Sequence, residues 1–151
     1  MQPQRLDAYH VAPAAMKVLR AVEGYLHQSS LDETLIELVK MRASQINGCA
    51  YCLDQHSKVL RRNGESEQRI YLLDAWEESP LYSPRERAAL AWTEALTSIA
   101  QSRAPDAVYD AVRGQFDDKA LIDLTVLIGM INLWNRLAIS LRYQHPVAAA
   151  P

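Results

Sequence analysis

The only two cysteines of the chain lie in one short stretch, QINGCAYCLDQHSKVLRRNG, residues 45–64. Two residues separate Cys49 from Cys52, and His56 follows four residues after Cys52. A thiolate is a nucleophile and a metal ligand, and a nearby imidazole can accept the proton of the thiol. This spacing is therefore a candidate for thiol–disulfide chemistry, peroxide reduction or metal binding.

The helix expected around the cysteines determines whether the two sulfurs can react. Asn47-Gly48 is a helix stop signal, so the next helix should begin near Cys49 and carry Cys49, Cys52 and His56 on one face. Regular helical geometry leaves Cβ atoms three residues apart at about 5–6 Å, whereas a disulfide needs roughly 3.5–4.5 Å. Only the first turn of a helix relaxes enough to close that gap. The positive end of the helix dipole at this point also favours a thiolate.

Two other interpretations of the cysteine pair stay open on this evidence. Cys49, Cys52 and His56 together with a carboxylate would supply four zinc ligands, but tetrahedral zinc sites usually add ligands from a distant segment, and the sequence has no second pair. Alternatively, both cysteines are small, inert, buried residues.

Glu37 is the carboxylate that could join this group, and it also has a simpler interpretation. Glu33, Glu37, Lys40 and Ser44 fall on one stripe at helical spacing, which is typical of a solvated face. On that face Glu37 would pair with Lys40, three residues away, at little energetic consequence.

The composition predicts a soluble globular protein of one domain. The chain has 151 residues, of which 49% are hydrophobic and 23% are charged, enough for one buried core. The formal net charge of −2 gives no electrostatic indication of nucleic acid or of an anionic membrane as a partner. The start MQPQRLDAYH has no basic region followed by an apolar run, so we expect a cytoplasmic location, where thiols stay reduced.

The hydrophobic pattern predicts an all-α fold of about six to seven helices, because no segment alternates with the period of a strand. The expected helices cover residues 13–27, 31–47 with Ser30 as the cap, 49–63, a short segment after Ser66, 84–101 with Ser83 as the cap, a short segment after Pro105, and a long segment after Asp117. That last segment is apolar on nearly every face and long enough to cross a membrane. Asp123, Asn132, Asn135 and Arg136 would be costly in hydrocarbon, so we expect a buried central helix or a subunit interface.

Read as one unit, ELVKMRASQINGCAYCLDQH resembles the E-x11-C-x2-C-x3-H core of the AhpD-like alkylhydroperoxidases, in the carboxymuconolactone decarboxylase superfamily. Glu37, Cys49, Cys52 and His56 match the four positions of that motif. The stretches RERAALAWTEALT and INLWNRLAISLR are also typical of small members. The resemblance covers about residues 10–143, and it implies a single AhpD-like domain over 1–151 with the cysteine pair at the start of a helix.

The resemblance implies a role for each of the four residues. Cys52 would attack the peroxide and become a sulfenic acid, and Cys49 would resolve it as a disulfide and act as proton donor. His56 and Glu37, linked through water, would form the proton relay. Partial burial of Glu37 would then raise its pKa towards a useful range.

The function implied is a thiol-dependent peroxidase that needs no metal, haem or flavin. It would reduce a hydroperoxide, or relay electrons to a peroxiredoxin, and take electrons from a lipoyl protein, thioredoxin or a small thiol. The resemblance also implies a homotrimer or homohexamer with the dithiol near a subunit interface. The alternative is a non-catalytic oligomeric redox sensor or adaptor that uses the same dithiol.

One position departs from the best-studied subgroup, which places a histidine immediately before the second cysteine. This chain has Tyr51 there, and tyrosine does not act as an acid–base group near neutral pH without a large shift in pKa. We therefore expect Tyr51 to be a packing or interface residue, and peroxidase turnover to be weaker or directed at another substrate.

Overall fold

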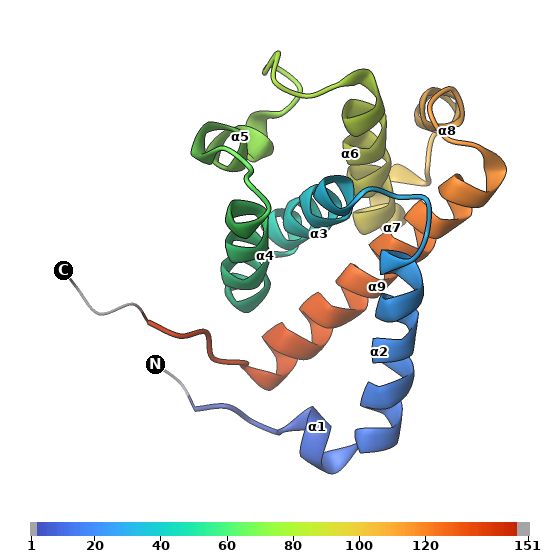
Figure 1. Cartoon of the computed structure of the whole chain (residues 1–151). Coiled ribbons are helices and arrows are strands. Elements are labelled where there is room, and N and C mark those ends of the chain that lie inside the picture. The colour runs from blue at the N-terminus through green and yellow to red at the C-terminus, as the bar shows by residue number, and fades with distance from the viewer. Residues whose placement is uncertain (1–2, 148–151) are drawn as a thin grey trace.

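The structure is a computed structural model and is described for residues 3–147. Within those residues it is all-helical and contains no strand (Figure 1). The elements are α1 (Ala8–Val11), α2 (Pro13–His27), α3 (Glu33–Asn47), α4 (Ala50–Arg62), α5 (Glu67–Leu72), the 3-10 turn η1 (Leu73–Ala75), α6 (Pro84–Thr97), α7 (Ile99–Ser102), α8 (Asp106–Arg113) and α9 (Asp118–Leu141). The all-α prediction is confirmed.

The helix count is slightly higher than the six to seven predicted, because two four-residue helices flank longer ones. Asp7 begins α1 by accepting the N–H groups of Tyr9 and His10. The helix expected from Ser83 towards residue 101 is interrupted at Ser98, whose backbone leaves the helical region at φ −103° and ψ 35°. Its last part is therefore the separate helix α7.

Local capping signals set most of the observed helix boundaries. Ser83 and Glu86 form the predicted capping box of α6, and Asp117 caps α9. The predicted cap of α3 is wrong: Asp32, not Ser30, accepts the N–H of Leu35 at 2.9 Å. Because Asp32 directly precedes the first helical residue, its carboxylate reaches the free N–H groups of the first turn.

Helix α3 lies at the centre of the molecule and packs against α4, α6 and α9 (Figure 1). Its residues divide between two hydrophobic clusters, with Leu35, Ile36 and Val39 in one and Leu38 and Met41 in the other. Neighbours on several sides leave α3 little exposed surface. Polar side chains in its middle turns consequently face other helices rather than water.

Helix α9 is, by length and composition alone, the one helix among the described residues that could cross a membrane, with 44% of its most apolar window buried inside the chain. It packs against α3 and α6. Its buried Asp123 accepts a hydrogen bond from the Tyr25 hydroxyl at 2.7 Å and one from Lys119 at 2.6 Å. These contacts fit the core helix of a soluble domain.

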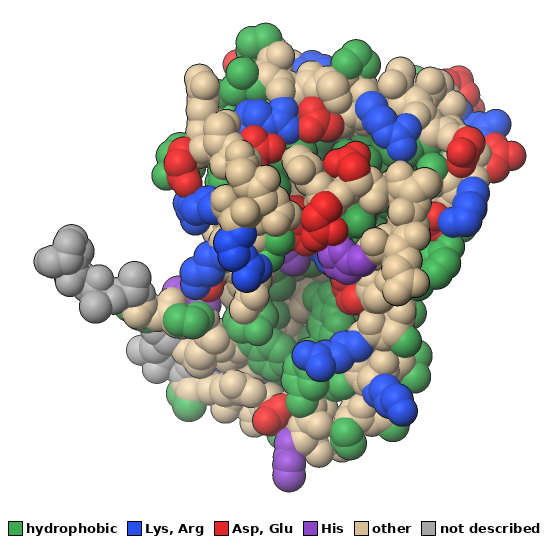
Figure 2. Space-filling model, viewed as in Figure 1, with side chains coloured by type: hydrophobic (Ala, Val, Ile, Leu, Met, Phe, Trp, Pro, Cys, Tyr) green, Lys and Arg blue, Asp and Glu red, His purple; other side chains and the backbone are tan. Residues whose placement is uncertain are grey.

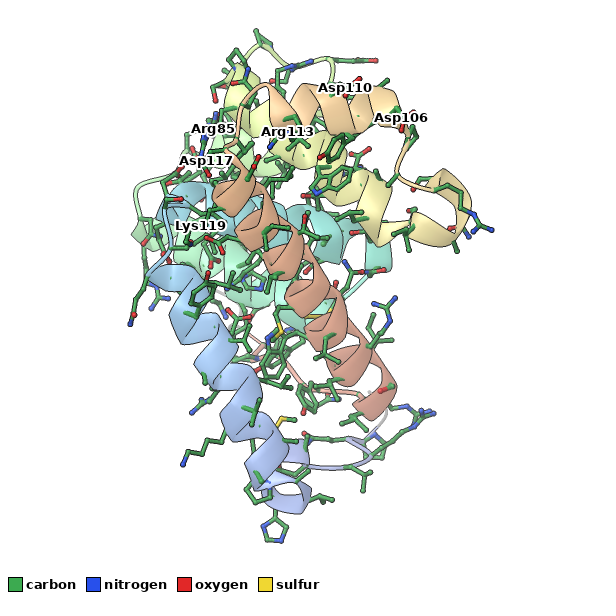
Figure 3. The ribbon with its side chains drawn as sticks, turned by 90° about the vertical axis from the view of Figure 1, so that its right-hand side faces the viewer. Arg85, Asp106, Asp110, Arg113, Asp117 and Lys119 are labelled. Carbon is green, nitrogen blue, oxygen red and sulfur yellow. A yellow bond between two sulfur atoms is a disulfide. The ribbon has the colours of Figure 1, made fainter. Side chains whose placement is uncertain are left out.

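Charged side chains gather where α8 leads into α9 (Figure 3). Arg113 at the end of α8 pairs with Asp118 in the first turn of α9. The Arg85 guanidinium lies over the ring of Phe116 at 3.8 Å, where a cation and an aromatic face attract each other. These contacts hold the start of α9 against α6 and α8. Further along its length, α9 packs against α3 and α4.

Candidate functional site

The cysteine pair lies at the first turn of α4. Cys49 is the N-cap residue, with an extended backbone at φ −86° and ψ 93°, and its sulfur accepts the N–H of Cys52 at 3.3 Å. A disulfide joins Cys49 to Cys52, with the Cα atoms 5.4 Å apart, within the range such bonds require. The position of the pair at a helix N-terminus is as predicted.

The break before α4 is held by side chains from α3 and α9. Gly48 has a left-handed backbone at φ 68°, a conformation that glycine adopts with little strain. Asn47 donates hydrogen bonds to the side-chain oxygens of Asn132 at 3.0 Å and Asn135 at 2.8 Å. Asn135 in turn donates to Ser44 at 3.0 Å. This network fixes the chain direction directly before Cys49.

Glu37 lies beside His56 and bonds to it directly, so the link through water that the resemblance implies is wrong for this pair. The Glu37 carboxylate is 2.8 Å from Nδ1 of His56 and is only 3% exposed. Because a carboxylate can only accept, Nδ1 carries the proton and Nε2 is left as the basic nitrogen. The contact is a direct hydrogen bond between the two side chains.

The pKa of Glu37 shifts in the direction opposite to our expectation. Burial, the largest influence, would raise the pKa of this carboxyl. The hydrogen bond to His56 and the positive charges of His56, Lys40 and His27 outweigh burial and hold the pKa below its usual value. Glu37 is therefore a carboxylate that orients His56, rather than an acid poised near neutral pH.

The interpretation of Glu37, Lys40 and Ser44 as a solvated face is wrong, because all three are buried. The ammonium group of Lys40 lies 2.7 Å from Glu23 and 3.7 Å from Glu37. The indole N–H of Trp134 donates to the other carboxylate oxygen of Glu23 at 2.8 Å.

Our sequence reasoning missed Glu23 and Trp134 as parts of this group. They lie on α2 and α9, and no local spacing connects them to the cysteine motif. A buried lysine needs an acidic partner, but the sequence alone does not show that Lys40 is buried.

A cavity of about 310 Å³ adjoins this group. Cys52 and His56 both line it, together with residues of α1, α2, α3 and α9. Figure 2 shows a hollow in the molecular surface, with hydrophobic side chains inside and histidine, basic and acidic side chains at its edge. Cys49 lines instead a second cavity of about 360 Å³, with Gly48 and Arg142. The two residues of the pair therefore line different cavities.

Tyr51, at the position where the best-studied subgroup has histidine, packs against Tyr143. Their ring centroids are 5.5 Å apart and the rings are nearly perpendicular, at 78°, an arrangement favoured for aromatic pairs. Both tyrosines line both cavities. Tyr51 is thus a packing residue of the site within one chain.

The zinc interpretation of the cysteine pair gains no support from the arrangement of possible ligands. Among the described residues one group of possible metal ligands stands out, formed by His27, Glu33 and Glu37, with ligand atoms within 4.8 Å of one another. These groups already pair: His27 with Glu33 at 2.8 Å, and Glu37 with His56. Neither cysteine belongs to that group.

Comparison with known proteins connects this geometry to a family. The profile of the Carboxymuconolactone decarboxylase family matches residues 13–95, more than half of the chain. The protein YdfG of Bacillus subtilis, itself uncharacterized, is 46% identical over 138 residues, which cover 91% of this chain and 94% of YdfG.

Solved structures agree in fold and in sequence. One is the crystal structure of an Agrobacterium tumefaciens protein of unknown function, described as an antioxidant defence protein AhpD. It superposes on this chain with a TM-score of 0.93. It is 45% identical, and the match covers 97% of this chain and 100% of that one. An uncharacterized peroxidase-related protein from Silicibacter has a TM-score of 0.79 at 25% identity, over 91% of this chain and 73% of its own. The chain therefore belongs to the carboxymuconolactone decarboxylase family, among its AhpD-like members.

Proposed function

We propose that this protein is a thiol-dependent peroxidase in which Cys52 attacks the hydroperoxide. One observation carries the proposal: Cys52 and His56 line the same cavity, and the buried Glu37 carboxylate accepts a hydrogen bond from Nδ1 of His56. A nucleophile, a base and an orienting acid in this order form the arrangement that activates thiols and hydroxyls in many enzymes.

The reaction requires the reduced form of the pair. Nε2 of His56 accepts the proton of the Cys52 thiol, and the thiolate attacks the terminal oxygen of the peroxide. The O–O bond breaks, an alcohol leaves with one proton, and Cys52 becomes a sulfenic acid. The Cys49 thiol then attacks the Cys52 sulfur, water leaves, and the disulfide forms. A donor dithiol returns two electrons and two protons to the pair.

The different surroundings of the two sulfurs support this division of roles. Cys52 lines the same cavity as the proposed base, His56, whereas Cys49 is the N-cap residue and its sulfur is within bonding reach of the Cys52 sulfur. The proposal includes a lipoyl protein, thioredoxin or a small thiol as the electron donor, and a peroxiredoxin as an alternative electron acceptor. It also includes assembly into a homotrimer or homohexamer. Exposed Ile122, Val126 and Leu133 on α9 are apolar residues that such an assembly would cover.

The test is steady-state consumption of cumene hydroperoxide with dihydrolipoamide, thioredoxin or dithiothreitol as donor. We expect multiple turnovers by the wild type, none by Cys52→Ser, and a single oxidation event by Cys49→Ser that a dimedone adduct on Cys52 reports. Mass spectrometry of the oxidised wild type should show the Cys49–Cys52 link. Turnover by Cys52→Ser at the wild-type rate would overturn the mechanism. If the protein is oxidised once and none of the donors supports further turnover, the result favours the alternative of a redox sensor.

A further inference from the structure

The cavity beside Cys52 is lined by one exposed arginine that forms no ion pair within the described residues. Arg20 of α2 lines this cavity, and its guanidinium lies 5.2 Å from the centre of the Tyr9 ring. Within residues 3–147 no carboxylate pairs with Arg20. A guanidinium held over a ring keeps its N–H donors free in its own plane, where they can bind a carboxylate with two hydrogen bonds.

The other charged groups of the cavity wall are already paired with one another. Lys40 binds Glu23 at 2.7 Å and lies 3.7 Å from Glu37, and Trp134 donates to the remaining oxygen of Glu23. His56 is bound to Glu37 through Nδ1. Among the charged side chains that line the cavity, Arg20 is therefore the one that pairs with no carboxylate within the described residues.

Apart from the polar Gln55, the rest of the wall is mostly aromatic and apolar, formed by Tyr9, Tyr51, Trp134, Tyr143, Ile131 and Ala138. Flat apolar groups pack well against such rings. A volume of about 310 Å³ lies at the lower end of the range for small-molecule sites, which suits a compact body rather than a long chain.

We propose that the preferred substrates are compact aromatic or branched organic hydroperoxides that carry a carboxylate, which binds Arg20 while the peroxide group lies at Cys52. This inference rests on the proposed function and adds to it the chemical class of the substrate. Hydrogen peroxide and small neutral hydroperoxides lack the group that Arg20 would bind, so they are the poorer substrates.

The experiment compares two hydroperoxides that differ only in the carboxylate: cumene hydroperoxide and its 4-carboxy derivative. For the wild type we expect kcat/KM to be about tenfold higher for the carboxylate, in line with one charge-assisted contact at a partly solvated site. Arg20→Gln should bring this ratio close to one, mainly through KM, and Arg20→Lys should keep part of the preference. Lys17→Gln is the matched control, because Lys17 is an exposed cation on the same helix that does not line the cavity, and it should retain the ratio.

The outcomes separate this inference from the proposed function. A wild-type ratio of one or below, or the same ratio in Arg20→Gln, overturns the carboxylate site and leaves the peroxidase proposal standing. If the protein consumes neither hydroperoxide, the proposed function fails. Titration calorimetry with 4-isopropylbenzoate and its amide then decides the site alone: tighter binding of the carboxylate by wild type than by Arg20→Gln supports it, and equal binding overturns it.

Discussion

Replacing Glu37 by glutamine tests the proposed proton relay most directly. The substitution keeps the size of the side chain and an oxygen that can accept the hydrogen bond from Nδ1 of His56, which is 2.8 Å away. It removes the negative charge and places an NH2 group where the second oxygen lies 3.7 Å from Lys40. Lys40 keeps its closer partner, Glu23 at 2.7 Å, so we expect the fold to persist with a loss of stability of about 1–3 kcal/mol.

The rate effect follows from the lost attraction between the carboxylate and a protonated His56. Two unit charges about 4 Å apart interact by roughly 4 kcal/mol at an effective dielectric constant of about 20. Since about 1.4 kcal/mol corresponds to a factor of ten, the full attraction would be worth roughly a thousandfold. The proton has only partly moved to His56 in the transition state, so we expect oxidation by hydroperoxide to slow about 100-fold at pH 7. Positioned general bases usually contribute about this much.

The measurement is a single-turnover assay that isolates this step. The pre-reduced protein is mixed with cumene hydroperoxide and the loss of free thiol is followed in quenched samples, with thermal unfolding as the check on folding. Glu33→Gln is the matched control: Glu33 lies one turn earlier on the same helix, pairs with exposed His27, and its loss should leave the rate within about twofold. If Glu37→Gln reacts within threefold of the wild type, Glu37 has no part in the relay.

Three further predictions concern stability. The folded-state pKa of Glu37 lies below its usual value, so its ionisation stabilises the fold above about pH 4.5. This contribution disappears as the pH falls through the folded pKa. Between about pH 5 and 3 the Glu37→Gln variant should therefore lose less free energy of unfolding than the wild type does, as measured by urea unfolding. Lys40→Met leaves Glu23 and Glu37 close together without their cation, so urea unfolding at pH 7 should show a loss of about 3–5 kcal/mol. Leu124→Ala removes a side chain that is 0% exposed and should cost about 3 kcal/mol in the same assay, whereas Ile122→Ala, at a position 62% exposed, should change stability by about 0.5 kcal/mol or less.

Local sequence patterns were sufficient to predict the helical fold and the place of the cysteine pair. Capping and stop signals act within one turn of chain, so Gly48 and Ser83 mark their helix boundaries without knowledge of the rest of the molecule. The turn before Cys49 and the spacing to His56 likewise depend only on neighbouring residues. The short helices α1 and α7 escaped prediction because four residues carry too little periodicity to be recognised.

Tertiary structure decided which groups meet at the site and in which charge state. Periodicity placed Glu37 and Lys40 on one stripe of α3 but could not say that α2, α4 and α9 cover that stripe, since burial depends on segments distant in sequence. Only packing brought Glu23, Trp134 and Arg20 to the cavity of Cys52. The direction of the Glu37 pKa shift was likewise beyond the sequence, because burial and nearby cations push the pKa in opposite directions and only their three-dimensional arrangement determines which prevails.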